Sequence, residues 1–564
     1  PFYKWFEDGV TNTCYNALDI HIDQGRGKKT ALIYDSPITG NKNQFSFEEL
    51  RSKVSKFAGA LQDQGVIKGD RVIIYMPMIP EAVVAMLACA RIGAIHSVVF
   101  AGFSSVALAA RINDAQCKVL LTADGGFRGN KITPLKEIAD EALKTCPSIK
   151  KSIVFQRTKQ EILWNPNLDV WWHEELKKVD DYYPAEPMDS EDELFILYTS
   201  GSTGNPKGMV HTCGGYMVYA SYSFLNVFQY SEGDVYWCTA DIGWITGHSY
   251  ILYGPLANGA TTVMFEGVPS YPDYGRFWEV CEKHKVNQFY TAPTAIRALA
   301  KHPLSFVNAY DLSNLKVLGT VGEPINEEAW HWYDDHIGKN KCPIVDTWWQ
   351  TETGGMMISS LANITKDKPT FATVPLPGIQ PVLLNTDGEE ISEIKAEGIL
   401  VIKHPWPSLA RTIYGDHKRY KNVYFSAYKN YYFPGDGALR DENGNYRITG
   451  RVDDVVIVSG HNLGTAPIEN AINEHNSVIE SAIVGFPDEI KGNALYAYII
   501  LYDENQASEN LIKEINQLIS KKIGPIAKCD KIQFVSGLPK TRSGKIMRRI
   551  LRKVASNNIS DLGD

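Results

Sequence analysis

The chain has 564 residues, of which 44% are hydrophobic and 22% are charged, an ordinary composition for globular proteins with large buried cores. This composition excludes disordered, collagen-like and disulfide-scaffold proteins. The formal net charge is −8, which argues against a protein that neutralises many nucleic-acid phosphates through its overall charge.

Short apolar runs alternate with helical patterns along the first four-fifths of the chain. A buried strand is predicted over residues 71–77, and Pro80 then opens a helix, because proline suits the first helical position. Residues 96–100 are typical of a second strand, and Ser104 is expected to cap a helix that runs to Asn113. Further buried strands are predicted over residues 118–124, 194–198, 261–265, 287–290 and 316–318. Strands that alternate with helices indicate parallel α/β layers.

The pattern changes after about residue 435. Residues 441–444, Asp-Glu-Asn-Gly, favour the turn of a hairpin between two short strands. A compact region of mixed helix and strand patterns follows, with the size of an independent small domain. We therefore predict a large, multi-subdomain α/β domain over residues 1–452 and a small, mobile α+β domain over residues 453–564.

The nine cysteines are scattered, and no two form a Cys-x-x-Cys pair. We expect reduced thiols in a reducing compartment, namely the cytoplasm, and no zinc site. The most apolar window, residues 82–100, is interrupted by Arg91, Gly93 and His96, so no membrane span is expected.

The strongest motif is residues 198–208, Tyr-Thr-Ser-Gly-Ser-Thr-Gly-Asn-Pro-Lys-Gly, which directly follows a predicted buried strand. Its glycines let backbone N–H groups turn inward, its hydroxyls donate and Lys207 adds charge, so the loop suits a polyphosphate. It is not a Walker A loop, because Pro206 and Gly208 stand where that motif needs glycine and serine or threonine. The alternative is a solvated Gly/Ser linker, which seldom follows a buried strand so closely.

Five further segments resemble, in the required order, the motifs of the adenylate-forming superfamily of acyl-CoA synthetases, luciferases and peptide-synthetase adenylation domains. Residues 321–325 resemble its adenine-binding turn, and residues 346–355 (Asp-Thr-Trp-Trp-Gln-Thr-Glu-Thr-Gly-Gly) resemble its aromatic–Thr–Glu motif. Residues 432–436 and 448–454 resemble the ribose and hinge motifs, and residues 538–545 resemble the loop that carries a catalytic lysine. The resemblance covers nearly the whole chain.

The resemblance implies a reaction of ATP, Mg²⁺ and coenzyme A in which a carboxylate first attacks the α-phosphate. Two anions approach each other in that step, so positive charge and magnesium must offset their repulsion. Lys545 matches the lysine that bridges carboxylate and α-phosphate, although its charge pattern alone would favour a solvated basic face. Glu352 matches the carboxylate near Mg²⁺, and Thr351 matches a donor to the α-phosphate; unmatched, Glu352 would be an ordinary surface acid.

The same resemblance assigns nucleotide contacts to residues of several motifs. Asp436 is expected to accept both ribose hydroxyls, Arg451 to support that sugar, and Asp453 to form the hinge between the domains. The other expected contacts are Thr199, Ser200, Gly201, Ser202, Thr203, Gly204, Lys207, Gly322, Glu323, Pro324, Asp346, Thr347, Trp348, Trp349, Gln350 and Asn462.

The resemblance places the acyl pocket at Ile245, Thr246, Val321 and Trp349. An indole at Trp349 fills the space that a longer acyl chain would need, which leaves room for an acid of about two or three carbons. Acetate is therefore the expected substrate, with propionate tolerated. The alternative interpretation is that Trp348 and Trp349 are both core packing residues.

Coenzyme A contacts are implied at Arg128, Lys131, Thr246, Ser459 and Gly460, and a metal-site position is implied at His475. The sequence departs from the usual pattern at four positions, which are Asn462, Ser520, Ser270 and Pro434. These departures put individual contacts in doubt and leave the reaction class unaffected.

The sequence thus predicts an acetate–CoA ligase that works through an acetyl-adenylate, with a lysine acetyltransferase or deacylase acting on Lys545 as a partner and with no nucleic acid or membrane partner. Three alternatives stay open. The first is a ligase for propionate or another short acid. The second is a nucleic-acid or membrane-surface module that uses the basic residues of 540–553, and the third is an adenylation domain that loads a carrier protein.

Overall fold

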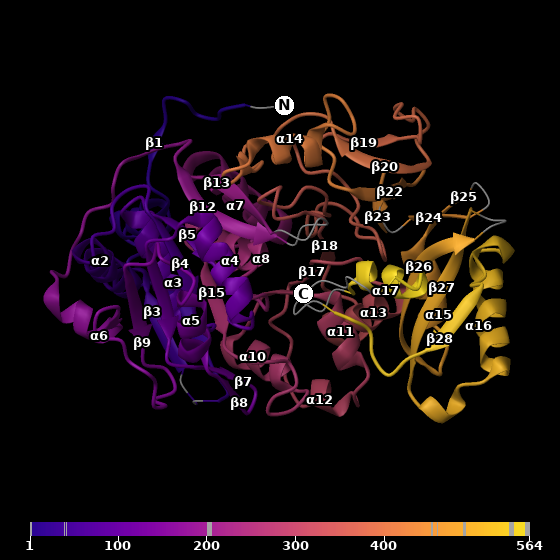
Figure 1. The fold of residues 1–564 in the computed structure, drawn as a ribbon, viewed down its shortest axis with the longest axis horizontal. Helices are drawn as coiled ribbons and strands as arrows, with labels where there is room; N and C mark the ends of the chain where they lie inside the picture. Colours follow the sequence, from indigo (N-terminus) through magenta and orange to yellow (C-terminus); the bar gives the residue numbers. More distant parts are fainter. Residues whose placement is uncertain are drawn as a thin grey trace. The chain divides into compact units, whose positions relative to one another are not determined.

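The computed structural model describes residues 3–38, 40, 42–199, 206–452, 455–458, 461–488, 492–540 and 546–558. The chain forms two compact units, the first from Pro1–Gln380 and Ile402–Tyr432 and the second from Pro381–Val401 and Phe433–Asp564 (Figure 1). Asp453, the predicted boundary and hinge, lies outside the described residues. The hinge at this position therefore stays a prediction.

One sheet of the first unit has eight strands in the order β10-β9-β6-β4-β5-β12-β13-β21. The strands are β10 (Asp169–Trp171), β9 (Lys151–Phe155), β6 (Val119–Ala123), β4 (Arg71–Tyr75), β5 (Ile95–Val98), β12 (Glu193–Thr199), β13 (Lys207–Thr212) and β21 (Thr412–Ile413). Neighbours from β10 to β12 are parallel, whereas β13 is antiparallel to both β12 and β21. The expectation of parallel layers is corrected at this edge, because the short β12–β13 connection can only join antiparallel strands.

The other large sheet of the first unit has seven strands in the order β18-β17-β16-β14-β15-β2-β3. The strands are β18 (Ile344–Asp346), β17 (Val317–Thr320), β16 (Gln288–Thr291), β14 (Val235–Cys238), β15 (Thr261–Phe265), β2 (Thr30–Asp35) and β3 (Lys42–Ser46). Only the pairing of β2 with β3 is antiparallel. Trp237, Trp278 and Phe289 lie in the hydrophobic core that packs on this sheet.

The helices of the first unit begin where the sequence signals predicted. Pro80 is the first residue of α3 (Pro80–Arg91), and the Ser104 side chain accepts from the Ala107 N–H at the start of α4 (Ser105–Ala115). The other helices of eight or more residues are α2 (Phe47–Asp63), α5 (Leu135–Leu143), α7 (Cys213–Phe228), α10 (Arg276–His284), α11 (Pro293–Ala300) and α14 (His417–Phe425). Among the described residues, no helix is long and apolar enough to cross a bilayer.

In its described residues, the second unit contains two mainly antiparallel sheets and three longer helices. One sheet runs β19 (Pro381–Leu384), β20 (Ala396–Ile402), β22 (Asp436–Arg440) and β23 (Tyr446–Arg451), and the β22–β23 hairpin confirms the turn predicted at residues 441–444. The other sheet comprises β24 (Val455–Val458), β25 (His461–Gly464), β26 (Val478–Asp488), β27 (Gly492–Leu501) and β28 (Lys531–Phe534). The helices are α15 (Thr465–Asn473), α16 (Glu509–Lys522) and α17 (Arg548–Ala555).

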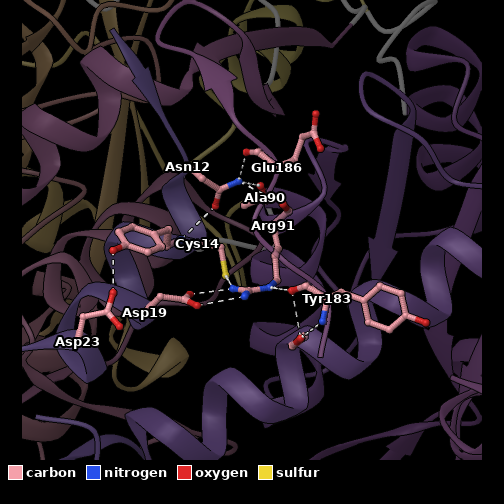
Figure 2. Close-up of polar contacts among 10 residues, drawn as sticks. Asn12, Cys14, Asp19, Asp23, Ala90, Arg91, Tyr183 and Glu186 are labelled. Carbon is pink, nitrogen blue, oxygen red and sulfur yellow. Dashed lines mark hydrogen bonds and ion pairs between the residues drawn. The ribbon is translucent and has the colours of Figure 1, made fainter. Parts of the chain in front are cut away.

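A buried ion pair joins distant segments of the first unit (Figure 2). Arg91, at the end of α3, is fully buried and donates from both terminal nitrogens to the Asp19 carboxylate, at 2.7 and 3.0 Å. Its Nε donates to the Tyr183 carbonyl at 2.7 Å. Asn12 adds hydrogen bonds to the carbonyls of Arg91 (3.2 Å) and Glu186 (2.9 Å), so the cluster ties residues 12–19 and 183–186 to α3.

All nine cysteines are free and buried in the structure. Burial raises the pKa of Cys213, the cysteine closest to the phosphate loop in sequence, to about 12. A thiol with so high a pKa is a poor nucleophile, which agrees with the interpretation of Cys213 as a packing residue.

Candidate active site

The two ends of the predicted phosphate loop lie side by side. Thr199 ends β12, Lys207 begins β13, and the two residues are partners in the antiparallel ladder. Residues 200–205, which include Ser200, Gly201, Ser202, Thr203 and Gly204, lie outside the described residues. The Thr199 hydroxyl oxygen is buried and has no hydrogen-bond partner within the described part of the chain, so it is free to bind a ligand.

Lys207 and Glu352 meet through a tyrosine hydroxyl. Glu352 is 8% exposed, and its Oε1 lies 3.5 Å from the Lys207 Nζ. Tyr424, from α14, accepts from the Lys207 Nζ at 2.6 Å and donates to the same Glu352 oxygen. Burial, together with the nearby Glu352 charge, holds the pKa of Tyr424 far above its ordinary value, so the hydroxyl stays protonated. The structure thus places Glu352, predicted for magnesium, beside Lys207 at the end of the predicted phosphate loop, together with Tyr424, which no sequence motif indicated.

The turn that carries Thr351 and Glu352 is fixed by its backbone. The carbonyls of residues 351, 352, 353 and 354 accept, in that order, from His211 Nε2 (2.8 Å), Ala410 N (2.9 Å), Trp406 Nε1 (2.9 Å) and Ser249 Oγ (2.8 Å). These donors come from separate parts of the first unit. Because each of these four carbonyls accepts a hydrogen bond, the backbone from which the side chains of residues 351 and 352 extend is fixed in position.

His211 was also missed by the sequence analysis, although it lies on β13 four residues after Lys207. Residues two and four apart on a strand point to the same face, so Lys207 and His211 contact the same turn. Burial lowers the pKa of His211 to about 3, so the ring is neutral and its proton must lie on Nε2 to donate to the carbonyl. The alternation along β13 could have suggested this pairing.

The predicted acyl-pocket residues are buried or half-buried, and Trp349 among them contacts the aromatic side chains of Tyr290 and Tyr250. Trp349 is 9% exposed, its Nε1 donates to the Tyr290 hydroxyl at 3.2 Å, and its ring meets Tyr250 edge-on at 4.9 Å. Ile245 and Val321 are buried, and Thr246 is half-buried. The indole is therefore held in one orientation by a hydrogen bond and a perpendicular ring contact.

Two other residues that are predicted to bind the nucleotide, Asp346 and Thr347, lie at the carboxyl end of β18 in the seven-stranded sheet. Asp346 ends β18 and accepts from the Thr320 hydroxyl at 2.6 Å, while the Thr347 hydroxyl donates to the Thr320 carbonyl at 2.8 Å. Burial raises the pKa of Asp346 to about 6, against a smaller lowering by the Thr320 bond. Ligands of open α/β sheets bind at the carboxyl ends of the strands, which is where these residues lie.

The turn at residues 322–324 is also anchored by side chains. Gly322 has a φ of +95°, in the left-handed region that favours glycine. The Glu323 carboxylate accepts from the Thr294 N–H at 2.8 Å and pairs with Arg297 at 2.9 Å, which ties the turn to α11. Pro324 follows and is exposed.

Trp348 and Gln350 are held on either side of Trp349. Trp348 is 8% exposed, and its backbone N–H donates to the Ile358 carbonyl at 2.9 Å. The Gln350 Oε1 accepts from the Tyr432 hydroxyl at 3.1 Å. Buried Trp348 agrees with packing, one of the two roles considered from the sequence.

The second unit holds the predicted ribose residues. Asp436 is buried at the start of β22, and Arg451, its partner across the hairpin, lies 3.5 Å from its carboxylate. The Arg451 Nη1 also donates to the Pro434 carbonyl at 2.7 Å, while half of its side chain is exposed. Ser459, Gly460 and Lys545 lie outside the described residues; for Asn462 the structure gives only its place in β25.

His475 has protein partners in the second unit. Its Nδ1 accepts from the Ser477 N–H at 3.2 Å, and its Nε2 lies 3.5 Å from a Glu514 oxygen. No group of three His, Cys, Asp or Glu residues suited to a metal ion occurs within the described ranges. The metal role of His475 therefore stays a prediction.

The predicted coenzyme A contacts Arg128 and Lys131 are partners across a short hairpin of β7 (Gly126–Arg128) and β8 (Lys131–Thr133). Both side chains are exposed, and the Arg128 guanidinium lies 5.8 Å from the centre of the Phe100 ring. Gly129 has a φ of +58°, which the tight turn requires. Two cations at one exposed hairpin tip suit a phosphorylated ligand.

Comparisons with known proteins cover nearly the whole chain. The model of the AMP-binding enzyme family matches residues 21–414, and that of the AMP-binding enzyme C-terminal domain matches residues 467–545. The acetyl-coenzyme A synthetase of Magnetococcus marinus is 55% identical over 561 residues, which is 100% of this chain and 87% of that protein. Those of Desulfatibacillum aliphaticivorans and Rhodobacter capsulatus are each 56% identical, over 100% of this chain and 86% of the relative.

Proposed function

The chain belongs to the AMP-binding enzyme family, and from this premise we propose that it is an AMP-forming acetate–CoA ligase. ATP and acetate give acetyl-AMP and diphosphate, and attack by the coenzyme A thiol then gives acetyl-CoA and AMP. The observation that carries the proposal is an identity of 55–56%, over the full chain, to proteins named acetyl-coenzyme A synthetase. The arrangement of Lys207, Glu352 and Trp349 supports it.

The first half-reaction brings the acetate carboxylate against the α-phosphate of ATP. Their repulsion must be offset by positive charge that is already in position. Lys207, at the end of the phosphate loop, is buried enough for its charge to act at close range, and Lys545 supplies the bridging ammonium in this proposal. Thr351 and Thr199 donate to the phosphates in this proposal, and the Thr199 hydroxyl has no partner among the described residues, as such a role requires.

Glu352 fits a role in holding Mg²⁺. Its contacts with Lys207 and Tyr424 both engage Oε1, so neither uses Oε2. Magnesium is commonly held by one or two carboxylates together with substrate phosphates, so a single protein carboxylate at this position is sufficient. When bound, the ion would neutralise charge on the phosphates.

The proposed nucleotide contacts come from several of the motifs. The turn at Gly322, Glu323 and Pro324 and the Trp348 ring would contact adenine, and Asp436 and Arg451 would bind the ribose. Asp436 is buried and lies 3.5 Å from Arg451, and its carboxylate has two oxygens that could accept from the two ribose hydroxyls. The loop at Ser200–Gly204, with Asp346, Thr347, Gln350 and Asn462, completes the proposed set.

Acetate is the proposed acid because the Trp349 indole is locked in place. A ring fixed by Tyr290 and Tyr250 cannot rotate away without losing both contacts, so it limits the acyl pocket formed with Ile245, Thr246 and Val321. One methylene in such a pocket is worth about 1–3 kcal/mol. A propionate ligase is therefore the second candidate, and it differs from the first only in the size of the acid that this pocket accepts.

The second half-reaction needs coenzyme A. Arg128 and Lys131 would receive its nucleotide phosphates, and Ser459 and Gly460 would line the channel for its thiol, with Asp453 as the hinge that admits it. The nine free cysteines agree with a reducing compartment, and we place the enzyme in the cytoplasm. Acetylation of Lys545 by an acetyltransferase, reversed by a deacylase, would silence the first half-reaction.

The test measures the two half-reactions separately. Wild-type enzyme should catalyse pyrophosphate–ATP exchange with acetate, more slowly with propionate and hardly at all with hexanoate. Lys545→Ala should lower that exchange by about 10²–10³-fold, because one preorganised charge is lost, but should still convert acetyl-AMP and coenzyme A to acetyl-CoA. Equal exchange with hexanoate and acetate would contradict the acid assignment, and loss of both half-reactions in Lys545→Ala would contradict the role of the lysine.

A further inference from the structure

One tyrosine hydroxyl contacts both charged groups beside the phosphate loop. The Tyr424 hydroxyl accepts from the Lys207 ammonium at 2.6 Å and donates to the Glu352 carboxylate. The lysine and the tyrosine are separated by 217 residues in the chain. The hydroxyl therefore uses its one donor and one acceptor site to link a phosphate-binding cation with the proposed metal-binding carboxylate.

The hydroxyl keeps that cation and carboxylate from closing into a direct ion pair. Charge-assisted hydrogen bonds between ammonium and carboxylate are typically about 2.7–2.9 Å long. The Lys207 Nζ and the Glu352 Oε1 are 3.5 Å apart, and each already has the hydroxyl as a partner. A tight pair would satisfy both charges and would have to be broken before a phosphate or a metal ion could bind.

Tyr424 is itself held in place by packing. Its side chain is 3% exposed, its ring stacks on Tyr432 at 5.7 Å with an interplanar angle of 16°, and the Lys207 ammonium lies 4.8 Å from its ring centre. Asp416 caps the N-terminus of α14 by accepting from the Arg419 N–H at 2.9 Å. The position of the hydroxyl is thus set by α14 and by a neighbouring ring, independently of the two charges.

We propose that Tyr424 is a positioning residue of the reaction, whose hydroxyl fixes the spacing of Lys207 and Glu352 and keeps the two from closing on each other, so that a magnesium-bound polyphosphate can contact both groups. This inference rests on the proposed function and adds to it a residue that acts through two others. In Tyr424→Phe the ring and its packing remain and only the hydroxyl is lost. Lys207 and Glu352 then close into a direct pair that competes with the nucleotide and its metal.

The test compares Tyr424→Phe with Tyr420→Phe. Tyr420 lies one turn earlier on α14, is fully buried, and donates its hydroxyl to the Ala410 carbonyl, so Tyr420→Phe also removes one buried hydroxyl, but one that donates to a backbone carbonyl and not to the Glu352 carboxylate. Acetate-dependent pyrophosphate exchange is measured against MgATP and against free Mg²⁺, together with the melting temperature of each variant. Tyr424→Phe should raise the half-saturating concentrations of MgATP and Mg²⁺ about tenfold, while Tyr420→Phe leaves them unchanged.

A double-mutant cycle separates positioning from packing. In a Glu352→Gln background, whose residual MgATP affinity is measured by calorimetric titration, Tyr424→Phe should have at most a twofold further effect, because its charged partner is already gone. Half-saturation within twofold of wild type in Tyr424→Phe, equal effects of the two tyrosine variants, or full additivity in the cycle would each overturn the inference. Wild-type enzyme without acetate-dependent exchange would instead refute the proposed function.

Discussion

Two ion pairs in the first unit show opposite designs. Arg91 and Asp19 form a closed pair, with two hydrogen bonds of 2.7 and 3.0 Å and nearly complete burial of both side chains. Lys207 and Glu352 form an open pair, at 3.5 Å, with a tyrosine hydroxyl between them. The first pair joins segments of the fold, whereas the second lies at the candidate active site.

The difference lies in what each pair leaves available. Every terminal nitrogen of Arg91 has an acceptor, so the pair can gain nothing from a ligand and loses much if one partner is removed. In the open pair the contacts of Glu352 with Lys207 and Tyr424 both engage Oε1, which leaves Oε2 for the metal ion of the proposed function. We therefore expect stability to depend on the closed pair and, in the proposed function, catalysis to depend on the open one.

The largest expected effect comes from breaking the closed pair. Asp19→Asn leaves the Arg91 guanidinium buried without a countercharge, which should lower the free energy of unfolding by about 3–5 kcal/mol. Chemical denaturation measures this change, and the activity of the protein that remains folded should equal that of wild type.

Glu174→Gln provides the control for Asp19→Asn. Glu174 pairs with Lys177 at 2.7 Å, but both side chains are about half exposed or more, so its loss should change the free energy of unfolding far less than Asp19→Asn does. Comparable destabilisation by both substitutions would remove the distinction between closed and exposed pairs.

Breaking the open pair should instead lower the activity and leave the stability nearly unchanged. Glu352→Gln keeps an oxygen that accepts from Tyr424 but removes the charge proposed for Mg²⁺, so pyrophosphate exchange should fall about 10²–10³-fold. Its unfolding midpoint should stay close to that of wild type. If Glu352→Gln unfolds as readily as Asp19→Asn, the open pair also stabilises the fold.

Asp346 is a third case for this comparison. It is a buried carboxylate that has no cation beside it among the described residues. Its pKa is about 6 in the folded protein against an ordinary 3.8, so the folded state binds the proton more tightly and stability falls as pH rises through this window. Above pH 6 the charge costs on the order of 2–3 kcal/mol. Asp346→Asn keeps the acceptor for Thr320 without the charge.

Asp346→Asn should therefore be more stable than wild type at pH 8, and this advantage should disappear near pH 4. Denaturation curves of both proteins at the two pH values measure it. An advantage of equal size at both values would mean that burial does not raise the Asp346 pKa.

Much of the fold could be predicted because its signals are local. The strand predicted over residues 261–265 has those bounds in the structure, Ser104 caps its helix, and the hairpin forms around residues 441–444. Each of these depends on residues within a few positions of one another. The antiparallel edge at β13 was not anticipated, because the rhythm of strands and helices gives no direction to a strand that follows a short loop.

The same distinction between local and long-range signals applies to the residues of the candidate site. Thr199, Lys207 and Glu352 belong to contiguous motifs, and from these motifs they are predicted to lie near phosphates and metal. Tyr424 and His211 belong to no motif; they reach the site across 72 and 140 residues of chain, from a short helix and a strand face.

By itself, then, the sequence determined the family and the reaction and predicted the charged groups of the site, because these signals lie in motifs of consecutive residues. Only the tertiary structure decided that Glu352 would be held open from Lys207 by a hydroxyl, while Arg91 and Asp19 would close into a saturated pair. Both pairs join oppositely charged residues far apart in sequence. Their difference depends on which third group the packing brings within hydrogen-bond distance, a property that no local pattern of residues encodes.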